Sequence, residues 1–427
     1  VRVRDEFDMF RERNRLWNHP PEVVRSLPKD APVIGMPRAL LAWSYAPFWR
    51  AFFGRLGVRL VLSGNTTRDL VDRSNAWVGA DYCFPVKIAH GHLRDLLDDP
   101  RISRIFVPYM VSAPPSEKTS EAFFCPYNIG LPAILRSAAS LGGADPDRIL
   151  HATLDLRWEQ AHGARRLHKD LGVALDRPLE AFVEAWRSAR EAQAGFEDEV
   201  RVAGRRALER LRETGQPAVV ILGRPYNVFD PGANLELPQK IAGLGLPVVP
   251  LEFLPLEEEH LGEEFRNTFW NFGRKILEGA RYIARTPGLH AIYFSNFSCG
   301  PDSFIQTFAE SIMGEKPMLM LELDEHGADA GYMTRLEAFA DVLRGNAAQT
   351  VPSFTFRSPP SDRTSLKDRS LWIPPMHEAA TQFIAAAMRA CGYNAQPLPV
   401  EDHEAFTMGR AQTRGGECLP CPATLGT

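Results

Sequence analysis

The sequence predicts an α/β protein built from tandem units with parallel sheets. Short apolar runs rich in Val and Ile alternate with amphipathic stretches along the chain. Strands that are buried on both faces and joined by helices have this pattern. The strands are expected at 33–36, 58–62, 105–107, 218–222, 247–251, 290–294 and 317–323.

Amphipathic segments between these runs predict the connecting helices. Several of them end at turn-forming glycines such as Gly54, Gly142 and Gly314. We therefore expect two full Rossmann- or flavodoxin-like units and a partial third. The helices are expected at 44–55, 84–97, 130–141, 234–243, 267–285, 301–313 and 331–344.

Two segments predict the domain boundaries. A polar stretch at 179–211 carries apolar residues at helical spacing and predicts a connecting helix. The segment 350–368 is rich in Pro, Ser and Arg and predicts a surface loop. The expected organisation is an N-terminal extension (1–30), a first α/β domain with Cys83 and Cys125 (31–175), a connecting helix (176–215), a second α/β domain with Cys299 (216–348), and a loop with a partial third unit carrying Cys418 and Cys421 (349–427).

Length and composition exclude several classes of protein. A chain of 427 residues is too long for one ordinary core. A net charge of -4 gives no broad electrostatic reason to bind nucleic acid or an anionic membrane. The sequence has no apolar run of the roughly 20 residues that a membrane helix needs, and its first thirty residues do not form a secretory signal. We expect a cytoplasmic protein, and one that is part of a longer chain, because both termini look cut.

The six cysteines are too sparse for a disulfide scaffold, so their local settings indicate their role. Three of them, Cys83, Cys299 and Cys418, stand in a repeated Cys-x-Pro unit. At Cys83 and Cys299 the proline falls where a helix is expected to begin, which places the thiol at or just before the N-cap. The positive end of the helix dipole favours the thiolate that a metal requires.

Cys125 lies in an aromatic segment shortly after the expected strand 105–107. Ligands in open α/β sheets gather beyond the carboxyl ends of the strands, so Cys83, Cys125 and Cys299 are expected to converge there. The alternative is that these cysteines are small buried apolar residues. Cys418 and Cys421 form a lone C-x-x-C that suits zinc, a redox disulfide or a cluster, and Cys391 is expected in the core at a helix end.

Other polar residues leave alternatives open. Arg38 and Arg224 each follow an expected strand, and each either grips a phosphate or carboxylate or bridges two loops. The acidic segment 322–329, with His326, either binds a metal or performs acid-base chemistry, or else caps the next helix. His90 and His92 point to different helix faces and are not a joint metal pair. The sequence has no phosphate-loop or dinucleotide motif, so no nucleotide is expected on this chain.

Taken together, several strings give the chain a family resemblance. It resembles the activase-related proteins of the 2-hydroxyacyl-CoA dehydratase system, relatives of the dehydratase and benzoyl-CoA reductase subunits, over roughly residues 30–345 and the last dozen. The strings that carry the resemblance are Gly35-Met36-Pro37-Arg38-Ala39-Leu40, Pro47-Phe48-Trp49, Cys83-Phe84-Pro85-Val86-Lys87, Ala89-His90-Gly91-His92, Cys125-Pro126-Tyr127, Gly223-Arg224-Pro225-Tyr226-Asn227, Asn296 to Ser303, Glu322 to Gly331 and Glu417-Cys418-Leu419-Pro420.

The resemblance implies an iron-sulfur, electron-transfer component of an ATP-dependent system that carries out low-potential radical chemistry on acyl-CoA. The implied cofactor is a [4Fe-4S] cluster, or a larger double cluster, on Cys83, Cys125 and Cys299, with Cys418 as a further cofactor ligand. Arg38, Arg224, Asn296 and Asp302 are implied to meet substrate or partner. The implied partners are an ATPase activator module or subunit, the dehydratase subunits or acyl-CoA, and a second copy of the chain in a homodimer. The competing interpretation is a non-enzymatic metal-binding or scaffold protein with structural zinc.

Overall fold

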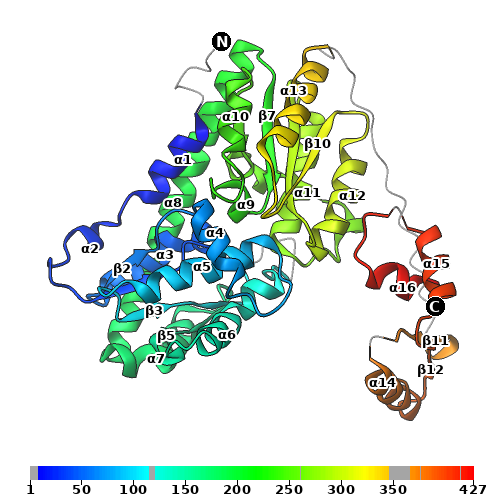
Figure 1. Ribbon diagram of the computed structural model, residues 1–427, viewed down its shortest axis with the longest axis horizontal. Helices are drawn as coiled ribbons and strands as arrows, with labels where there is room; N and C mark the ends of the chain where they lie inside the picture. Colours follow the sequence, from blue (N-terminus) through cyan, green and yellow to red (C-terminus); the bar gives the residue numbers. More distant parts are fainter. Residues whose placement is uncertain (1–7, 115–120, 260, 346–365, 376, 414) are drawn as a thin grey trace. The chain divides into compact units, whose positions relative to one another are not determined.

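The computed structural model describes residues 8–114, 121–259, 261–345, 366–375, 377–413 and 415–427 (Figure 1). The chain divides into two compact units, Val1–Cys299 with Phe308–Phe354, and Gly300–Thr307 with Thr355–Thr427. The domain boundaries expected from the sequence stay a prediction. Most of the expected loop at 350–368 lies outside the described residues, and its last three positions form the 3-10 helix Leu366–Asp368.

The first unit contains two parallel four-stranded sheets, and the first of these has the strand order β2-β1-β3-β5. Numbered along the chain, this is the 2-1-3-4 order of flavodoxin-like folds. The pair β4-β6, also parallel, follows β3 and β5 after a short break. The strands are β1 (Val33–Met36), β2 (Arg59–Leu62), β3 (Arg104–Phe106), β4 (Tyr109–Met110), β5 (Ile149–Leu150) and β6 (Thr153–Leu154).

The second sheet repeats the same order with β8-β7-β9-β10. Strand β7 is buried at all six positions, as expected for a central parallel strand covered on both faces. These two sheets confirm the predicted tandem α/β fold. The strands are β7 (Ala218–Gly223), β8 (Val248–Pro250), β9 (Leu289–Asn296) and β10 (Met318–Leu323).

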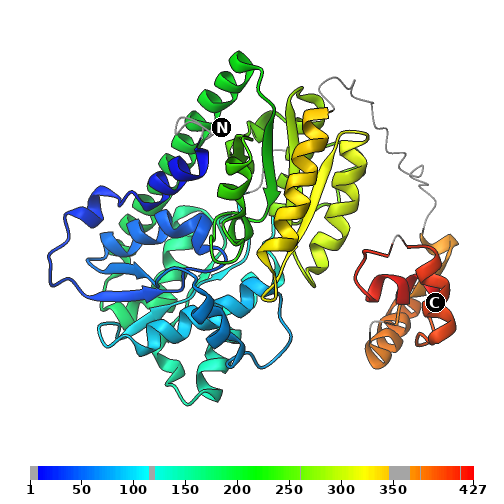
Figure 2. The ribbon, with the colours of Figure 1, turned by 45° about the horizontal axis from the view of Figure 1, so that its top comes forward.

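Helix α8 (Leu179–Thr214) joins the two sheets and packs on α3 (Ala42–Arg55), which is almost wholly buried (Figure 1). Aromatic rings fill the contact, with Phe52 meeting Phe182 at 5.8 Å between ring centroids. Helix α1 (Met9–Asn18) lies along α8 (Figure 2). The other helices of this unit are α2 (Glu22–Arg25), α4 (Arg68–Asn75), α5 (Phe84–Asp98), α6 (Pro126–Leu141), α7 (Gln160–Leu175), α9 (Pro225–Val228), α10 (Leu237–Gly243), α11 (Asn271–Arg285) and α13 (Asp329–Gly345); α12 (Gly300–Met313) begins in the second unit and ends in the first.

The second unit has a two-stranded parallel sheet of β11 (Ser370–Ile373) and β12 (Asn394–Pro397), crossed over by α14 (Glu378–Ala390). Helices α15 (His403–Ala411) and α16 (Pro420–Gly426) follow and pack on each other. Their contact is close because Gly409 faces the backbone of Pro422, where a Cβ would overlap the carbonyl oxygen. This part corresponds to the partial third α/β unit that the sequence predicts.

Candidate functional site

The three leading cysteines occupy equivalent positions at helix starts. Cys83 is the N-cap residue of α5, Cys125 of α6 and Cys299 of α12, and each helix has a proline in its first two positions. None of these side chains makes a capping hydrogen bond to its own helix, and all three thiols are partly exposed. Each of the three sulfur atoms therefore stands at the positive end of a helix dipole, beside the N–H groups of the first turn.

Tyr226, in the first turn of α9, is electrostatically coupled to all three cysteines. Burial raises the pKa of its hydroxyl well above the ordinary value; the Arg224 guanidinium opposes this, and the charges of Cys125, Cys299 and Cys83 add to it. Because Coulomb interactions fall with distance, the three cysteines are within electrostatic reach of this buried tyrosine.

The loops after β7 and β9 place Tyr226 and Cys299. The strand order of the second sheet reverses between these two strands, which is the usual ligand position in open α/β sheets. The side-chain amide of Asn296 donates to the Asn227 Oδ1 at 2.9 Å and bridges the two loops. Ser298 adopts a left-handed φ of 62°, and the Cys299 N–H donates to the Asn296 carbonyl at 3.1 Å. This tight turn starts α12 directly at the cysteine.

Cys125 follows β3 and β4, at the equivalent reversal in the first sheet. Its segment is tied to the second half of the unit by backbone hydrogen bonds. The Phe123 N–H donates to the Phe269 carbonyl, and the Asn271 N–H donates to the Phe123 carbonyl, each at 2.9 Å. Phe124 is fully buried, and its ring lies 5.7 Å from that of Phe272. The aromatic, dry surroundings that the sequence suggested for Cys125 therefore exist on one side of this residue.

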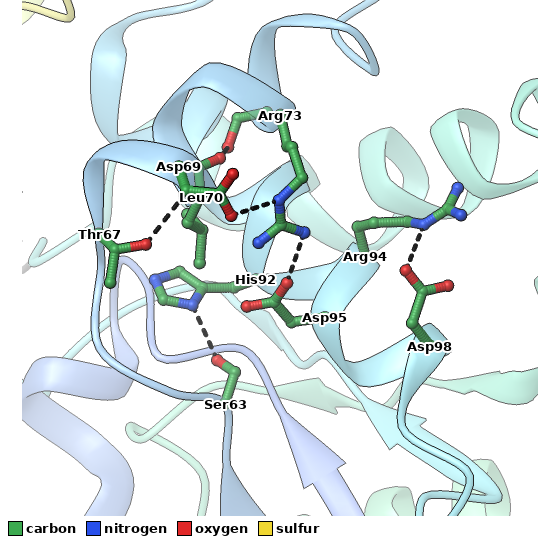
Figure 3. A network of polar contacts seen from close by, with 10 residues as sticks. Ser63, Thr67, Asp69, Leu70, Arg73, His92, Arg94, Asp95 and Asp98 are labelled. Atoms are coloured by element: carbon green, nitrogen blue, oxygen red, sulfur yellow. Dashed lines mark hydrogen bonds and ion pairs between the residues drawn. The ribbon is translucent and has the colours of Figure 1, made fainter.

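A buried series of hydrogen bonds joins the first half of the unit, which contains the first sheet, to the second half, which contains the second sheet. The His92 ring lies 2.9 Å from the Ser63 Oγ through Nδ1 and 3.0 Å from the Thr66 Oγ1 through Nε2. The Thr66 hydroxyl donates to Asp230 Oδ2 at 2.6 Å, so it accepts from His92 Nε2–H, which leaves Nδ1 to accept from Ser63. Figure 3 shows the contact between Ser63 and His92 beside the ion pairs of the neighbouring helices. His92 therefore links the loop after β2 to helix α5 through these hydrogen bonds.

Two members of this hydrogen-bonded series, Asp230 and His92, have pKa values that differ from their ordinary values. Burial raises the pKa of Asp230 to about 6, although the Thr66 hydroxyl and two backbone N–H groups oppose it. Burial lowers the pKa of His92 to about 3, and the charge of Arg38 lowers it further. The imidazole is therefore neutral over the whole physiological range, as the hydrogen-bond directions require.

The two arginines and the acidic segment lie near these connections. The Arg38 Nε donates to the Ser63 carbonyl at 3.0 Å and so bridges the loops after β1 and β2. Arg224 is 1% exposed and is the N-cap residue of α9. The Lys87 Nζ pairs with Glu325 Oε1 at 2.6 Å, so the carboxylate of the acidic segment binds the helix that begins at Cys83.

The remaining expected residues belong to the second unit. Asp302 is fully buried in the first turn of α12, and the Cys418 N–H donates to the Ser303 Oγ at 3.2 Å. Burial raises the pKa of the Cys421 thiol. Cys391 does end a helix, α14, but its side chain is exposed, so the expectation of a core position was wrong. The helix is apolar on more than one face, which made its end look buried.

Cysteine thiolates are the ligands that iron-sulfur clusters use, and a cluster carries them on different irons. Among the described residues, no group of three or more His, Cys, Asp or Glu side chains lies close enough to hold one metal ion.

Sequence reasoning missed Tyr226, Thr66 and Asp230. Tyr226 stood in a quoted motif but was interpreted only through its neighbour Arg224. Thr66 and Asp230 are separated by 164 positions, and neither stands in a motif of its own. The only available signal was that each residue closely follows a buried strand or its loop, where α/β proteins place their ligands.

The fold defines an α/β protein with two parallel sheets, in which Cys83, Cys125 and Cys299 each cap the N-terminus of a helix. The sequence matches the family described as the CoA enzyme activase uncharacterised domain (DUF2229) over residues 33–254, slightly more than half of the chain. The chain belongs to this family. The match covers Cys83, Cys125 and Tyr226, whereas Cys299 lies beyond it.

Two further comparisons give no closer identification. No curated protein matches the sequence. One solved structure, described as a sugar binding protein of Salmonella typhimurium LT2, is 12% identical in sequence, with a TM-score of 0.17 over 80% of this chain and 98% of its own. Similarity at that level supports no inference about fold or ligand. None of the described helices is both long and apolar enough to cross a lipid bilayer.

Proposed function

We propose that this chain is the iron-sulfur, electron-transfer component of an ATP-dependent 2-hydroxyacyl-CoA dehydratase system. The observation that carries the proposal is that Cys83, Cys125 and Cys299 are each the N-cap residue of a helix and all influence the hydroxyl of Tyr226 electrostatically. Membership of a CoA enzyme activase family supports the wider setting. A [4Fe-4S] cluster bound there would supply low-potential one-electron transfer.

The chain's own residues would prepare the site for that role. Each of the three thiols would stand at the positive end of a helix dipole. The high pKa of the Tyr226 hydroxyl keeps it neutral, so it can donate a hydrogen bond and adds no negative charge beside the thiolates. The Asn227–Asn296 bridge fixes the two loops that carry Tyr226 and Cys299.

Cys418 enters the proposal as the fourth thiolate candidate. Three cysteines leave one iron of a cubane without a protein ligand, and we favour a site open to substrate oxygen, because catalytic metal centres keep an exchangeable position. Deleting residues 411–427 tests this choice. Retained iron supports the open site, whereas complete loss of iron with intact secondary structure makes Cys418 or Cys421 a required ligand.

Anaerobic purification followed by iron, sulfide and zinc analysis tests the proposal as a whole. The expected product is brown and contains iron with acid-labile sulfide, and Cys83→Ser, Cys125→Ser or Cys299→Ser removes most of both. Cys391→Ser is the matched control, because that cysteine is exposed at a helix C-terminus and no helix-starting proline follows it. A colourless, zinc-loaded protein that is indifferent to the three substitutions would establish the zinc scaffold instead.

The division of labour with a partner is tested separately. The chain lacks a phosphate loop, so ATP hydrolysis is assigned to an ATPase activator, which drives electron transfer through a conformational change. Calorimetry of the isolated chain with ATP and Mg²⁺ should show no binding. Tight ATP binding by the chain alone would mean that nucleotide and cluster share one polypeptide.

A further inference from the structure

A cavity of about 310 Å³ lies beside the loop that carries Tyr226, and the proposed function does not use it. Its walls come from α3, α8, α9, α11 and the segment 251–259, all within the first unit. Buried apolar side chains form most of the surface, including Phe196 and Val200 of α8, Val228 of α9, Leu254, and Phe272 of α11. The space and its lining are typical of a small-molecule site.

One buried polar atom in the wall lacks a partner. Gln193 is 8% exposed, and its side-chain amide nitrogen donates to the Ser44 carbonyl at 3.1 Å and to Glu197 Oε1 at 2.9 Å. Both partners are acceptors, so the amide cannot be turned around. The atom left without a hydrogen bond is therefore the carbonyl oxygen, Gln193 Oε1. An unpaired buried acceptor is costly, and a ligand that donates a hydrogen bond would satisfy it.

The same part of the cavity is rich in acceptors. Tyr45 lines it, and burial raises the pKa of the Tyr45 hydroxyl, an effect that the Glu197 carboxylate strengthens. This phenol therefore stays neutral beside the carboxylate. Glu197 has no cationic partner among the described residues, and its only hydrogen bond comes from Gln193. Gln193, Tyr45 and Glu197 together offer oxygen atoms, one of them on a carboxylate that has no ion pair among the described residues.

The other charged groups of the lining are largely neutralised. Glu252, Glu259 and Glu278 pair with Arg13, Arg285 and Arg274, respectively. Arg201 pairs with Asp198 on its own helix. Lys275 is an exposed cation on α11 without an ion pair among the described residues, so a carboxylate ligand is the chemical rival of a cation.

We propose that this cavity binds a small apolar primary amine in its protonated form. An ammonium group has three N–H donors and no acceptor, which matches the oxygens of Gln193, Tyr45 and Glu197. The rings of Phe196 and Phe272 supply apolar surface for the body of the ligand. The hydrocarbon part fills the remaining volume against the Leu and Val side chains. A ligand here lies against the loop after β7, since Gly223 and Pro225 also line the cavity.

Isothermal titration calorimetry with three ligands of one shape tests the proposal at pH 7.5 on the full chain. The probes are 2-phenylethylamine, the neutral 2-phenylethanol and the acidic 3-phenylpropionate. The amine should bind at least tenfold more tightly than either analogue, because hydrogen bonds to a charged group are the stronger ones. Glu197→Gln should weaken amine binding about tenfold and leave the alcohol unchanged.

Two further variants locate the site. Val200→Trp should abolish binding of the amine by filling the cavity, and Gln193→Leu should weaken it without adding bulk at the mouth. Glu191→Gln, an exposed carboxylate on α8 outside the cavity, is the matched control and should bind like the unchanged chain. Glu197 is exposed, so its substitution does not threaten folding. Preferred binding of the acid, no measurable amine binding, or binding unchanged in Glu197→Gln and Val200→Trp would overturn the proposal.

Discussion

The chain of hydrogen bonds from His92 through Thr66 to Asp230 predicts two substitutions with opposite pH dependence. The folded-state pKa of Asp230 is about 6, above its ordinary value of 3.8. The folded protein thus binds more protons than the unfolded chain between these values, and the stability contribution of Asp230 falls as pH rises. The folded-state pKa of His92 is about 3, below 6.5, so its contribution rises with pH across that range.

The two effects cancel in the unsubstituted protein near pH 5. Each group changes the free energy of unfolding by up to about 1.4 kcal/mol per pH unit, because one pKa unit corresponds to that amount. Between pH 4.5 and 5.5 both groups are inside their windows, so the slopes are nearly equal and opposite. Asp230→Asn removes the falling term, and its stability relative to the unsubstituted protein should rise with pH. His92→Gln removes the rising term, and its relative stability should fall with pH.

Urea unfolding at pH 4.5, 5.0 and 5.5, followed by tryptophan fluorescence, measures these slopes. All tryptophans except Trp372 lie in the first unit, so the fluorescence reports the unfolding of that unit. Subtracting the unsubstituted protein at each pH removes the other titrating groups. Asp98→Asn, in an exposed ion pair with Arg94, is the control and should show no slope. Slopes of the same sign in the two variants would refute the proton assignment along the chain.

Three further substitutions test the packing and the site. Gly204→Ala should cost about 1–3 kcal/mol in urea unfolding, because a Cβ on α8 would overlap the carbonyl oxygen of Phe253; unchanged stability would contradict that close approach. Arg13→Met should cost about 3 kcal/mol at neutral pH, since it leaves Glu252 without the guanidinium that pairs with it at 2.6 Å, and a neutral result would show that the pair is dispensable. Cys391→Ser should leave both stability and iron content unchanged, as metal analysis and circular dichroism would show.

Strong local patterns predicted the sheets. The expected strand at 33–36 coincides with β1, and the strands expected at 218–222, 290–294 and 317–323 differ from β7, β9 and β10 by one or two residues at an end. β7 and β9 are buried at nearly every position, and even the partly buried edge strand β10 is mostly apolar, so the signal is continuous. Their parallel order follows from the alternating helices, and the observed 2-1-3-4 order agrees with it.

Short and polar elements were not predicted, because they lack the continuous apolar pattern of the buried strands. Strands β4 and β6 have two residues each, too few for any periodicity. Helix α1 has only three buried apolar residues among many charges, and its buried Arg13 breaks the apolar stripe. The stabilising contacts of α1 are with α8 and α3, far away in the sequence. The residues of α1 alone therefore do not indicate which elements it packs against.

The N-cap positions of the cysteines were predictable from the sequence, but the residues around them, such as Tyr226, were not. Cys-x-Pro marks a helix start locally, so the N-cap positions of Cys83 and Cys299 follow from two residues. Tyr226, whose hydroxyl the three thiols influence, lies in the loop after β7. Its position relative to Cys83 and Cys125 depends on how the two sheets face each other. Its role therefore appears only when both halves are folded together.

Three connections join the first sheet and its helices to the second sheet, and two of them begin at a cysteine segment. The Lys87–Glu325 ion pair anchors the first turns of the helix that follows Cys83 to the segment after β10. The backbone pairing of Phe123 anchors the Cys125 segment to the residues before α11. The Thr66–Asp230 hydrogen bond joins the loop after β2 to the segment after α9, close to Tyr226 in sequence. Because no single sheet supplies all three thiols, the fragment 31–175 alone contains only Cys83 and Cys125, and it lacks both Cys299 and Tyr226.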